Sequence, residues 1–214
     1  SQNFLSDNSL MEIANLRKQL LVALMELGFL PRESQDKWNQ HSKYPKLVSA
    51  VVCAGLYPRV IRVQKPKAEY QETMAGAFEK MNRGGVVKHY IREDPGRVFI
   101  HPASVFMEEK EHPHSYLVYF EKALTSKLYI RDATVANPYS ILLFGGEISV
   151  QHEAGTIKVD DWITYSAAAR IAVLAKSIRG ELDHLLRRKI SRPQTDITNS
   201  AVIGAIVQLL VAPF

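Results

Sequence analysis

The stretch from Gly96 to Thr134, GRVFIHPASVFMEEKEHPHSYLVYFEKALTSKLYIRDAT, decides the fold of this 214-residue chain. Its segments RVFIHP, SYLVYFEK and KLYIRDAT are rich in β-branched and aromatic residues, and each is short enough for a strand. Polar residues stand where these strands end or begin: His101 precedes a proline, and Thr125, Ser126 and Lys127 come just before the last run. The stretch therefore predicts three strands with polar side chains at their ends, where loops begin.

Further strand-like runs lie on both sides of this stretch. They are VIRV, VVKHYIRE, SILLFGGEISVQ and IKVDDWITYSA, at 60–63, 86–93, 140–151 and 157–167. Turn residues such as Asp94-Pro95-Gly96 and Asn137-Pro138 separate successive runs, and no helical pattern stands between them. This order predicts an antiparallel barrel or sandwich rather than alternating strands and helices. The Lys-rich residues 64–85 show no pattern, and we expect them to form a mobile insertion.

Helical patterns occupy both ends of the chain. Leucines recur at helical spacing in residues 9–27, where Ser9 and Glu12 form a capping box and Gly28 suits a left-handed helix end. Pro45 opens a short apolar helix, and two more helices follow at 168–190 and 198–210.

The whole pattern predicts an α+β chain, mainly β, built on a small five- to six-stranded antiparallel barrel of the oligonucleotide-binding (OB) type. We expect a helical segment, the barrel with its insertion, and closing helices at 1–57, 58–166 and 167–214.

Composition limits the function classes. The formal charge of +5 and the pI of about 9.2 are compatible with an anionic partner without proving one. The single cysteine, Cys53, lies in an apolar run and fits a core position in a reducing compartment. No apolar stretch is long enough to span a membrane, and the chain begins without methionine or signal segment. We expect an intracellular, nuclear or cytoplasmic piece of a longer protein, although an organellar parent fits equally.

The chain lacks the motifs of the common active sites. It contains no GxxxxGK[ST], no GxGxxG after a strand, no HExxH and no CxxC. His101, His112 and His114 lie close in sequence, but prolines follow two of them and no cysteine supports them, so a metal site is not predicted. We therefore expect no catalytic residue, metal or cofactor within these residues.

Several long stretches resemble the C-terminal region of DEAH-box and RNA-helicase-A-type RNA helicases. NFLSDNSLMEIANLRKQL is similar to the end of their helical ratchet region, and LVSAVVCAGLYPRV to the start of their OB domain. VFIHPASV and YLVYFEKALTSKLYIRDAT resemble the middle of that domain, and NPYSILLFGGEISV with VDDWITYSAAARIAVLAKSIRGELDHLLRRKI resembles its end. Arg59 stands where the family has asparagine and Ala103 where it has serine, and the insertion is outside the pattern.

The resemblance implies an accessory module rather than a motor. ATP and Mg²⁺ would be bound upstream, in two RecA-like domains of a parent RNA helicase that hydrolyses ATP. In this family the OB domain caps the RNA channel, contacts the backbone of the single strand and docks onto the first RecA-like domain. Some members also receive protein activators, including G-patch proteins.

With the resemblance, eight residues are candidates for RNA contact: His101, Ala103, Ser104, Thr125, Ser126, Lys127, Arg131 and Arg59. Backbone N–H groups after His101 suit phosphate and ribose, and two hydroxyls beside Lys127 form a possible phosphate clamp. Arg131 shares a strand face with Lys127, or else pairs with Asp132 or Glu121. Phe99 and Tyr129 are either stacking platforms or core. The alternative function is a protein-interaction module, in which RNA contact is incidental and these charges are scattered or buried.

Overall fold

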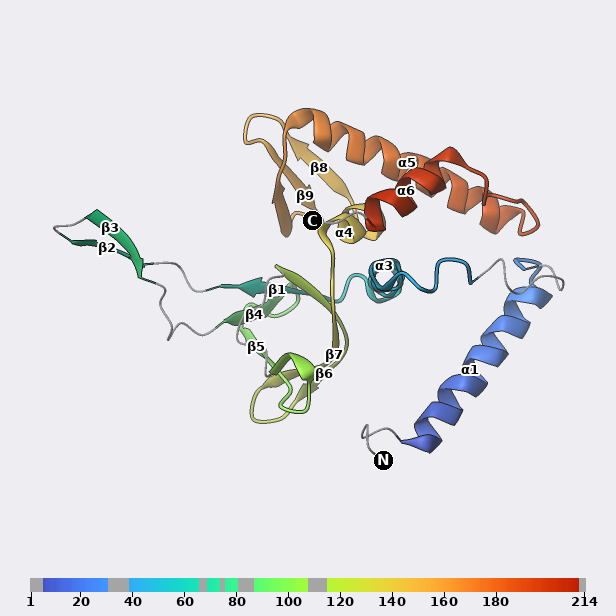
Figure 1. Cartoon of the computed structure of the whole chain (residues 1–214), viewed down its shortest axis with the longest axis horizontal. Helices are drawn as coiled ribbons and strands as arrows, with labels where there is room; N and C mark the ends of the chain where they lie inside the picture. The colour runs from blue at the N-terminus through green and yellow to red at the C-terminus, as the bar shows by residue number, and fades with distance from the viewer. Residues whose placement is uncertain are drawn as a thin grey trace.

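The computed structural model describes residues 6–30, 39–65, 69–73, 76–80, 87–107 and 115–211, with the backbone alone for 69–73, 76–80 and Ala169. Within these residues it contains a five-stranded barrel, a separate three-stranded sheet, a two-stranded hairpin and five α-helices (Figure 1). The α+β class and the OB-like barrel are thus confirmed. The helices span more residues than the strands, so the expectation of a mainly β chain is not met.

Five strands form the barrel: β1 (Val60–Gln64), β4 (Lys88–Ile91), β5 (Arg97–Ile100), β6 (Tyr116–Leu124) and β7 (Leu128–Val135). Their pairings run in the order β1–β4–β5–β7–β6 and return to β1. The ring closes on one side through two short pairings, β4 with β5 and β5 with β7, each of two residue pairs. The β5–β7 pairing is parallel and the other four are antiparallel, a mixture that the sequence pattern did not predict.

The barrel interior is filled by side chains that alternate along the strands. Ile61, Val98, Leu117 and Ile130 are almost completely buried, together with Val63, Ile91, Ile100 and Tyr119. Because successive side chains of a strand point to opposite faces, burial of Val98, Ile100 and Ile130 turns their neighbours on β5 and β7 outward. The core of the barrel thereby fixes which residues face solvent.

The run 140–151, predicted as one strand, is a helix followed by a strand of another sheet. α4 (Pro138–Phe144) begins where the Asn137 side chain accepts a hydrogen bond from the Tyr139 N–H, with Pro138 at the start of the helix. β8 (Ile148–Gln151) then pairs with β9 (Thr156–Val159), which pairs with β10 (Ile163–Ser166). The barrel strands therefore end at Val135, and the later strands form their own sheet.

The N-terminal helices follow the predicted pattern with one shift. α1 (Asp7–Glu26) is capped by the Ser6 side chain, which accepts from the Ser9 N–H, so Ser6 and not Ser9 is its N-cap. Gly28 has the predicted left-handed conformation, with φ of +77°. No residue of α1 is buried, and α1 extends away from the other elements in Figure 1. α3 (Pro45–Leu56) starts at Pro45 as predicted.

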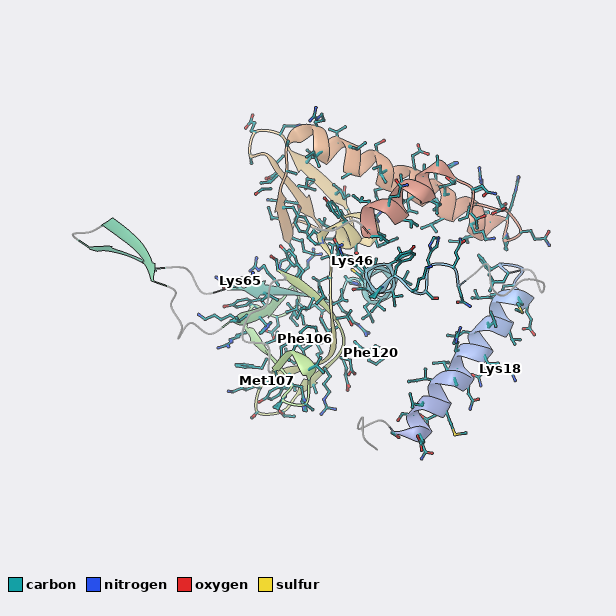
Figure 2. All side chains as sticks on the ribbon, in the orientation of Figure 1. Lys18, Lys46, Lys65, Phe106, Met107 and Phe120 are labelled. Carbon is teal, nitrogen blue, oxygen red and sulfur yellow. The ribbon has the colours of Figure 1, made fainter. Side chains whose placement is uncertain are left out.

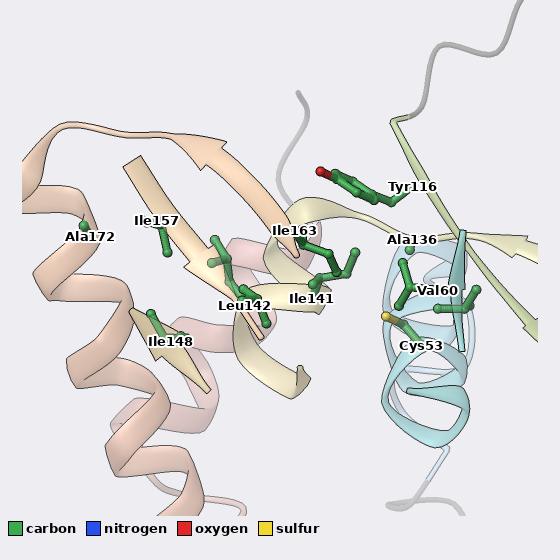
Figure 3. Close-up of a cluster of buried hydrophobic side chains, with 12 residues drawn as sticks. Cys53, Val60, Tyr116, Ala136, Ile141, Leu142, Ile148, Ile157, Ile163 and Ala172 are labelled. Atoms are coloured by element: carbon green, nitrogen blue, oxygen red, sulfur yellow. The ribbon is translucent and has the colours of Figure 1, made fainter. Parts of the chain in front are cut away.

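The C-terminal helices cover α3 and α4. α5 (Ala169–Ser191) and α6 (Ala201–Val211) contribute Leu182, Ile206 and Leu210 to a core that includes Ala50 of α3 and Leu143 of α4. A second cluster joins Cys53, Val60, Tyr116 and Ala136 to side chains of α4, β8–β10 and α5 (Figure 3). This cluster fixes the barrel against the three-stranded sheet.

The expected insertion contains regular backbone structure. β2 (Glu69–Thr73) and β3 (Gly76–Lys80) pair as an antiparallel hairpin between β1 and β4, which projects from the barrel (Figure 1). A short 3₁₀ turn, η1 (Val105–Met107), follows β5, and Phe106 and Met107 lie toward the end of the barrel remote from α5 and α6 (Figure 2). None of the described helices is long and apolar enough to cross a membrane.

Candidate nucleic-acid interface

Two neighbouring strands place a row of basic and aromatic side chains on the outside of the barrel. Because Val98, Ile100 and Ile130 point inward, the alternate residues point outward: Arg97, Phe99 and His101 along β5 and its end, and Lys127, Tyr129 and Arg131 along β7 and its start. The parallel register sets Phe99 opposite Tyr129. We call these six residues the β5–β7 face.

Phe99 lies at the centre of one half of the β5–β7 face. The Lys127 ammonium is 4.6 Å from the centroid of its ring and the Arg97 guanidinium carbon 4.8 Å. These distances are typical of cation–π contacts. The Phe99 and Tyr129 rings are tilted against each other, with centroids 6.2 Å apart. Phe99 therefore positions two cations, and Tyr129 offers the adjacent aromatic surface.

His101 and Arg131 form the other half of the face. A guanidinium nitrogen of Arg131 lies 3.3 Å from His101 Nε2, and the imidazole packs edge-on against Tyr129 with ring centroids 5.9 Å apart. Arg131 is exposed and His101 is half-buried. The alternative pairing of Arg131 with Asp132 or Glu121 is not found among the described residues, although Glu121 is its direct cross-strand neighbour.

The amides after His101 are not offered to a ligand, contrary to the expectation for Ala103 and Ser104. The Ala103 N–H donates to His101 Nδ1 at 3.1 Å, and the Ser104 N–H donates to the His101 carbonyl at 2.9 Å. Ser104 Oγ accepts from the Phe106 N–H at 3.3 Å. These hydrogen bonds stabilise the tight turn after β5 and hold the His101 side chain in place. The backbone N–H groups of Ala103 and Ser104 are therefore already used within the turn.

Thr125, Ser126 and Lys127 form the tip of the hairpin between β6 and β7, where Leu124 pairs with Leu128. The Thr125 N–H donates to the Lys127 carbonyl at 3.0 Å, and all three residues are exposed. Counted along the chain, β6 and β7 are the fourth and fifth barrel strands, so this is the loop between them, and β5 is the third barrel strand. OB folds bind oligonucleotides with that loop and with the face of the second and third strands. The hairpin tip thus adjoins the expected binding surface.

Seven of the eight predicted residues therefore border one face, and Arg59 does not. Arg59 is next to β1, two strands further around the barrel, and its guanidinium donates to the Phe120 carbonyl at 2.6 Å. Its guanidinium carbon lies 5.9 Å from the Phe120 ring centroid, and Phe120 is 60% exposed.

Sequence reasoning missed Arg97 and left Phe99 and Tyr129 as either stacking platforms or, by preference, core residues. The signal was present as alternation, since residues 97, 99 and 101 and residues 127, 129 and 131 repeat at a spacing of two. The sequence did not show that these two runs are neighbours. Two other barrel tyrosines lie away from this face: Tyr119 is buried, and Tyr90 lies beside Arg62, whose guanidinium carbon is 5.9 Å from its ring centroid.

Two other chemically reactive side chains, Cys53 and Tyr57, are packed or hydrogen-bonded within the fold. Burial raises the pKa of Cys53 to about 11, which agrees with its predicted core role. Tyr57 donates its hydroxyl to Asp160, whose other oxygen accepts from the Glu147 N–H at 2.9 Å. Burial first and this bond second raise the pKa of Tyr57 to about 12. Across the described residues no cluster of metal-ligating side chains is found, and His112 and His114 lie outside those residues.

Two known protein families match successive parts of the chain. Residues 48–148 match the oligonucleotide/oligosaccharide-binding (OB) fold family, and residues 155–212 match the C-terminal domain in RNA helicases.

The chain is 39% identical over 217 residues to the ATP-dependent DNA/RNA helicase DHX36 of Bos taurus, with 97% of this chain and 20% of that protein covered. It is 36% identical to the Homo sapiens protein of the same name, with 97% and 20% covered. It is also 36% identical to the DExH-box ATP-dependent RNA helicase DExH1 of Arabidopsis thaliana, with 98% and 20% covered. The chain thus spans about a fifth of the length of these relatives. The predicted resemblance is confirmed, and the chain belongs to the C-terminal region of the DExH/DEAH-box RNA helicase family, with its OB fold followed by its C-terminal domain.

Proposed function

We propose that this chain is the single-stranded RNA-binding accessory module of a longer ATP-dependent RNA helicase. ATP and Mg²⁺ would be bound by RecA-like domains elsewhere in the parent protein, and this module would dock onto them and regulate the motor. Its relatives are named as ATP-dependent helicases, and the match covers nearly all of this chain.

The observation that carries the proposal is the composition of the β5–β7 face. Lys127, Arg97 and Arg131 provide three cations, and half-buried Phe99 and Tyr129 provide aromatic surface between them. A basic groove with interleaved aromatic rings suits single-stranded nucleic acid, because cations attract phosphates and any base can stack on a ring. Cations contact phosphates and aromatic rings stack on any base, so we expect little sequence preference.

A protein-interaction module remains the alternative. Under that alternative we expected His101, Lys127 and Arg131 to be scattered over the surface or buried. Their gathering on one accessible face of the barrel favours RNA contact. A protein activator would then bind elsewhere on the module.

A salt titration tests the proposal. We would measure binding of the 214-residue chain to fluorescently labelled oligouridylate between about 50 and 200 mM salt. Each phosphate contact contributes roughly 0.7 to the slope of log K against log salt for single strands, so Lys127→Ala/Arg131→Ala should flatten it by about 1.4. Lys176→Ala/Arg187→Ala, on exposed positions of α5, removes equal charge and should leave the slope near wild type. Equal slopes in the two double variants would contradict the proposal.

A further inference from the structure

Both ring nitrogens of His101 face hydrogen-bond donors. The Ala103 amide N–H points at Nδ1 from 3.1 Å, and an Arg131 guanidinium nitrogen lies 3.3 Å from Nε2. An amide nitrogen and a guanidinium donate and never accept. A neutral imidazole has one acceptor nitrogen and one N–H, so it satisfies only one of these two donors at a time. A charged imidazolium, with two N–H groups, satisfies neither.

The turn that follows β5 decides which contact is kept. The His101 N–H donates to the Ile130 carbonyl at 2.9 Å, and the His101 carbonyl accepts from the Ser104 N–H at 2.9 Å. These backbone bonds hold the Ala103 amide against Nδ1, whereas Arg131 is exposed on a long side chain. This arrangement favours the neutral tautomer that carries its proton on Nε2. In that tautomer the Nε2–H group and the Arg131 guanidinium lie side by side as two donors, and neither can accept from the other.

We infer that His101 and Arg131 form a two-donor subsite for one phosphate group, in which His101 acts as a neutral donor whose tautomer is set by the Ala103 amide. A phosphate oxygen carries the lone pairs that both donors need, and hydrogen bonds to an ionised acceptor are stronger than neutral ones. The inference rests on the proposed binding of single-stranded RNA and assigns the phosphate contact to specific atoms. It also explains how alanine serves at position 103, since the contact uses only the main chain.

The groups around the subsite agree with this assignment. The Tyr129 ring packs edge-on against the imidazole, with ring centroids 5.9 Å apart. Glu121 is opposite Arg131 in the β6–β7 register. In the described residues it forms no ion pair with Arg131, so the guanidinium stays available to an incoming phosphate.

A matched pair of substitutions tests the role of Nε2. In His101→Asn, the amide oxygen takes the place of Nδ1 and accepts from Ala103, but the side chain ends short of the Nε2 position. In His101→Gln, the amide NH₂ reaches the Nε2 position. We expect His101→Asn to weaken oligouridylate binding by about tenfold, and His101→Gln to remain within about threefold of wild type. Neither should change the salt slope, because the lost donor is neutral, whereas Arg131→Ala should flatten it by about 0.7.

The tautomer is read directly from the imidazole ¹⁵N chemical shifts of the 214-residue chain. The free chain should carry its proton on Nε2, and oligouridylate should shift that nitrogen more than Nδ1. A proton on Nδ1, or equal binding by wild type, His101→Asn and His101→Gln, overturns the inference. If those three bind equally while Lys127→Ala/Arg131→Ala flattens the slope, the RNA-binding function stands without this subsite. A shift with inorganic phosphate and none with RNA assigns the site to a free anion and also overturns the inference.

Discussion

Phe99 and Tyr129 stand directly opposite each other in the parallel pairing of β5 and β7, with ring centroids 6.2 Å apart. This pairing joins two segments separated by about thirty residues of chain. It sets the Lys127 and Arg97 cations against one ring and the His101 imidazole against the other. The aromatic pair thereby holds the charged groups of the β5–β7 face in one row.

Replacing Phe99 tests whether the ring positions its two cations. Phe99→Leu keeps an apolar side chain but removes both cation–π contacts, each worth about 0.5–1 kcal/mol at an exposed site. We expect RNA affinity to fall about fivefold in an anisotropy titration, with the salt slope nearly unchanged because no charge is lost. Leu124→Ala, a 79% exposed position at the end of β6 in the hairpin that carries Lys127, serves as the control. Wild-type affinity in Phe99→Leu would show that the cations need no such support.

Glu121 should weaken RNA binding, because it is the cross-strand neighbour of Arg131. Side chains at directly opposed positions share a face and lie close enough to interact. We expect Glu121→Gln to raise RNA affinity about two- to threefold at low salt, with the gain disappearing as salt screens the charge. Glu153→Gln, in the turn between β8 and β9, removes the same charge away from the face. An equal gain in both variants would indicate a net-charge effect only.

Gly145 is required by the close packing at the end of α4. A Cβ at this position would overlap the Ile141 carbonyl oxygen and approach Val159 Cγ1 to 2.9 Å. We expect Gly145→Ala to lower the free energy of unfolding by about 1–3 kcal/mol in urea denaturation, because backbone and core must move apart. Gly180→Ala, in α5 with open space around the added carbon, should instead stabilise by up to about 1 kcal/mol. A stable Gly145→Ala variant would mean that the end of α4 adjusts without cost.

The hydroxyl of Tyr57 should make stability depend on pH in the alkaline range. Its pKa rises from 10.0 to about 12 on folding, by burial and by the bond to Asp160. The folded chain holds this proton more tightly than the unfolded chain, so the contribution is complete below pH 10 and is lost between pH 10 and about 12.

We expect Tyr57→Phe to reduce the loss of stability in that window, measured as urea midpoints at pH 8 and pH 11. Tyr44→Phe, at an exposed position, is the matched control. Burial also raises the pKa values of Tyr116, Tyr119 and Tyr165, so part of the loss should remain in the Tyr57 variant. An unchanged alkaline slope in Tyr57→Phe would contradict the role given to its hydroxyl.

Cys53 should be unreactive while the chain is folded. Its side chain is completely buried and its pKa is about 11, so little thiolate exists near neutral pH. We expect a thiol-specific dye at pH 8 to modify Cys53 only after urea unfolds the chain. Rapid modification of the folded chain would show that the α3 core opens readily, since Cys53 is the single cysteine.

Much of the local structure could be predicted because neighbouring residues determine it. Alternation at a spacing of two identified the five barrel strands, and Pro45 and Gly28 marked helix boundaries where the structure has them. The run 140–144 misled the prediction because a short apolar segment is equally suited to a buried strand or a buried helix. Asn137 and Pro138, taken as a turn, are the start of α4.

The sequence by itself determined the family, the strand alternation and the polar residues at strand ends, because each of these depends on residues adjacent in the chain. Only the tertiary structure decided which strands are neighbours. The short parallel pairing of β5 and β7 brings His101 to Arg131 and Phe99 to Lys127, and leaves Arg59 two strands away. The physical reason is that closing the barrel depends on burying side chains such as Val98 and Ile130 together, and this long-range packing sets the register of every outward side chain.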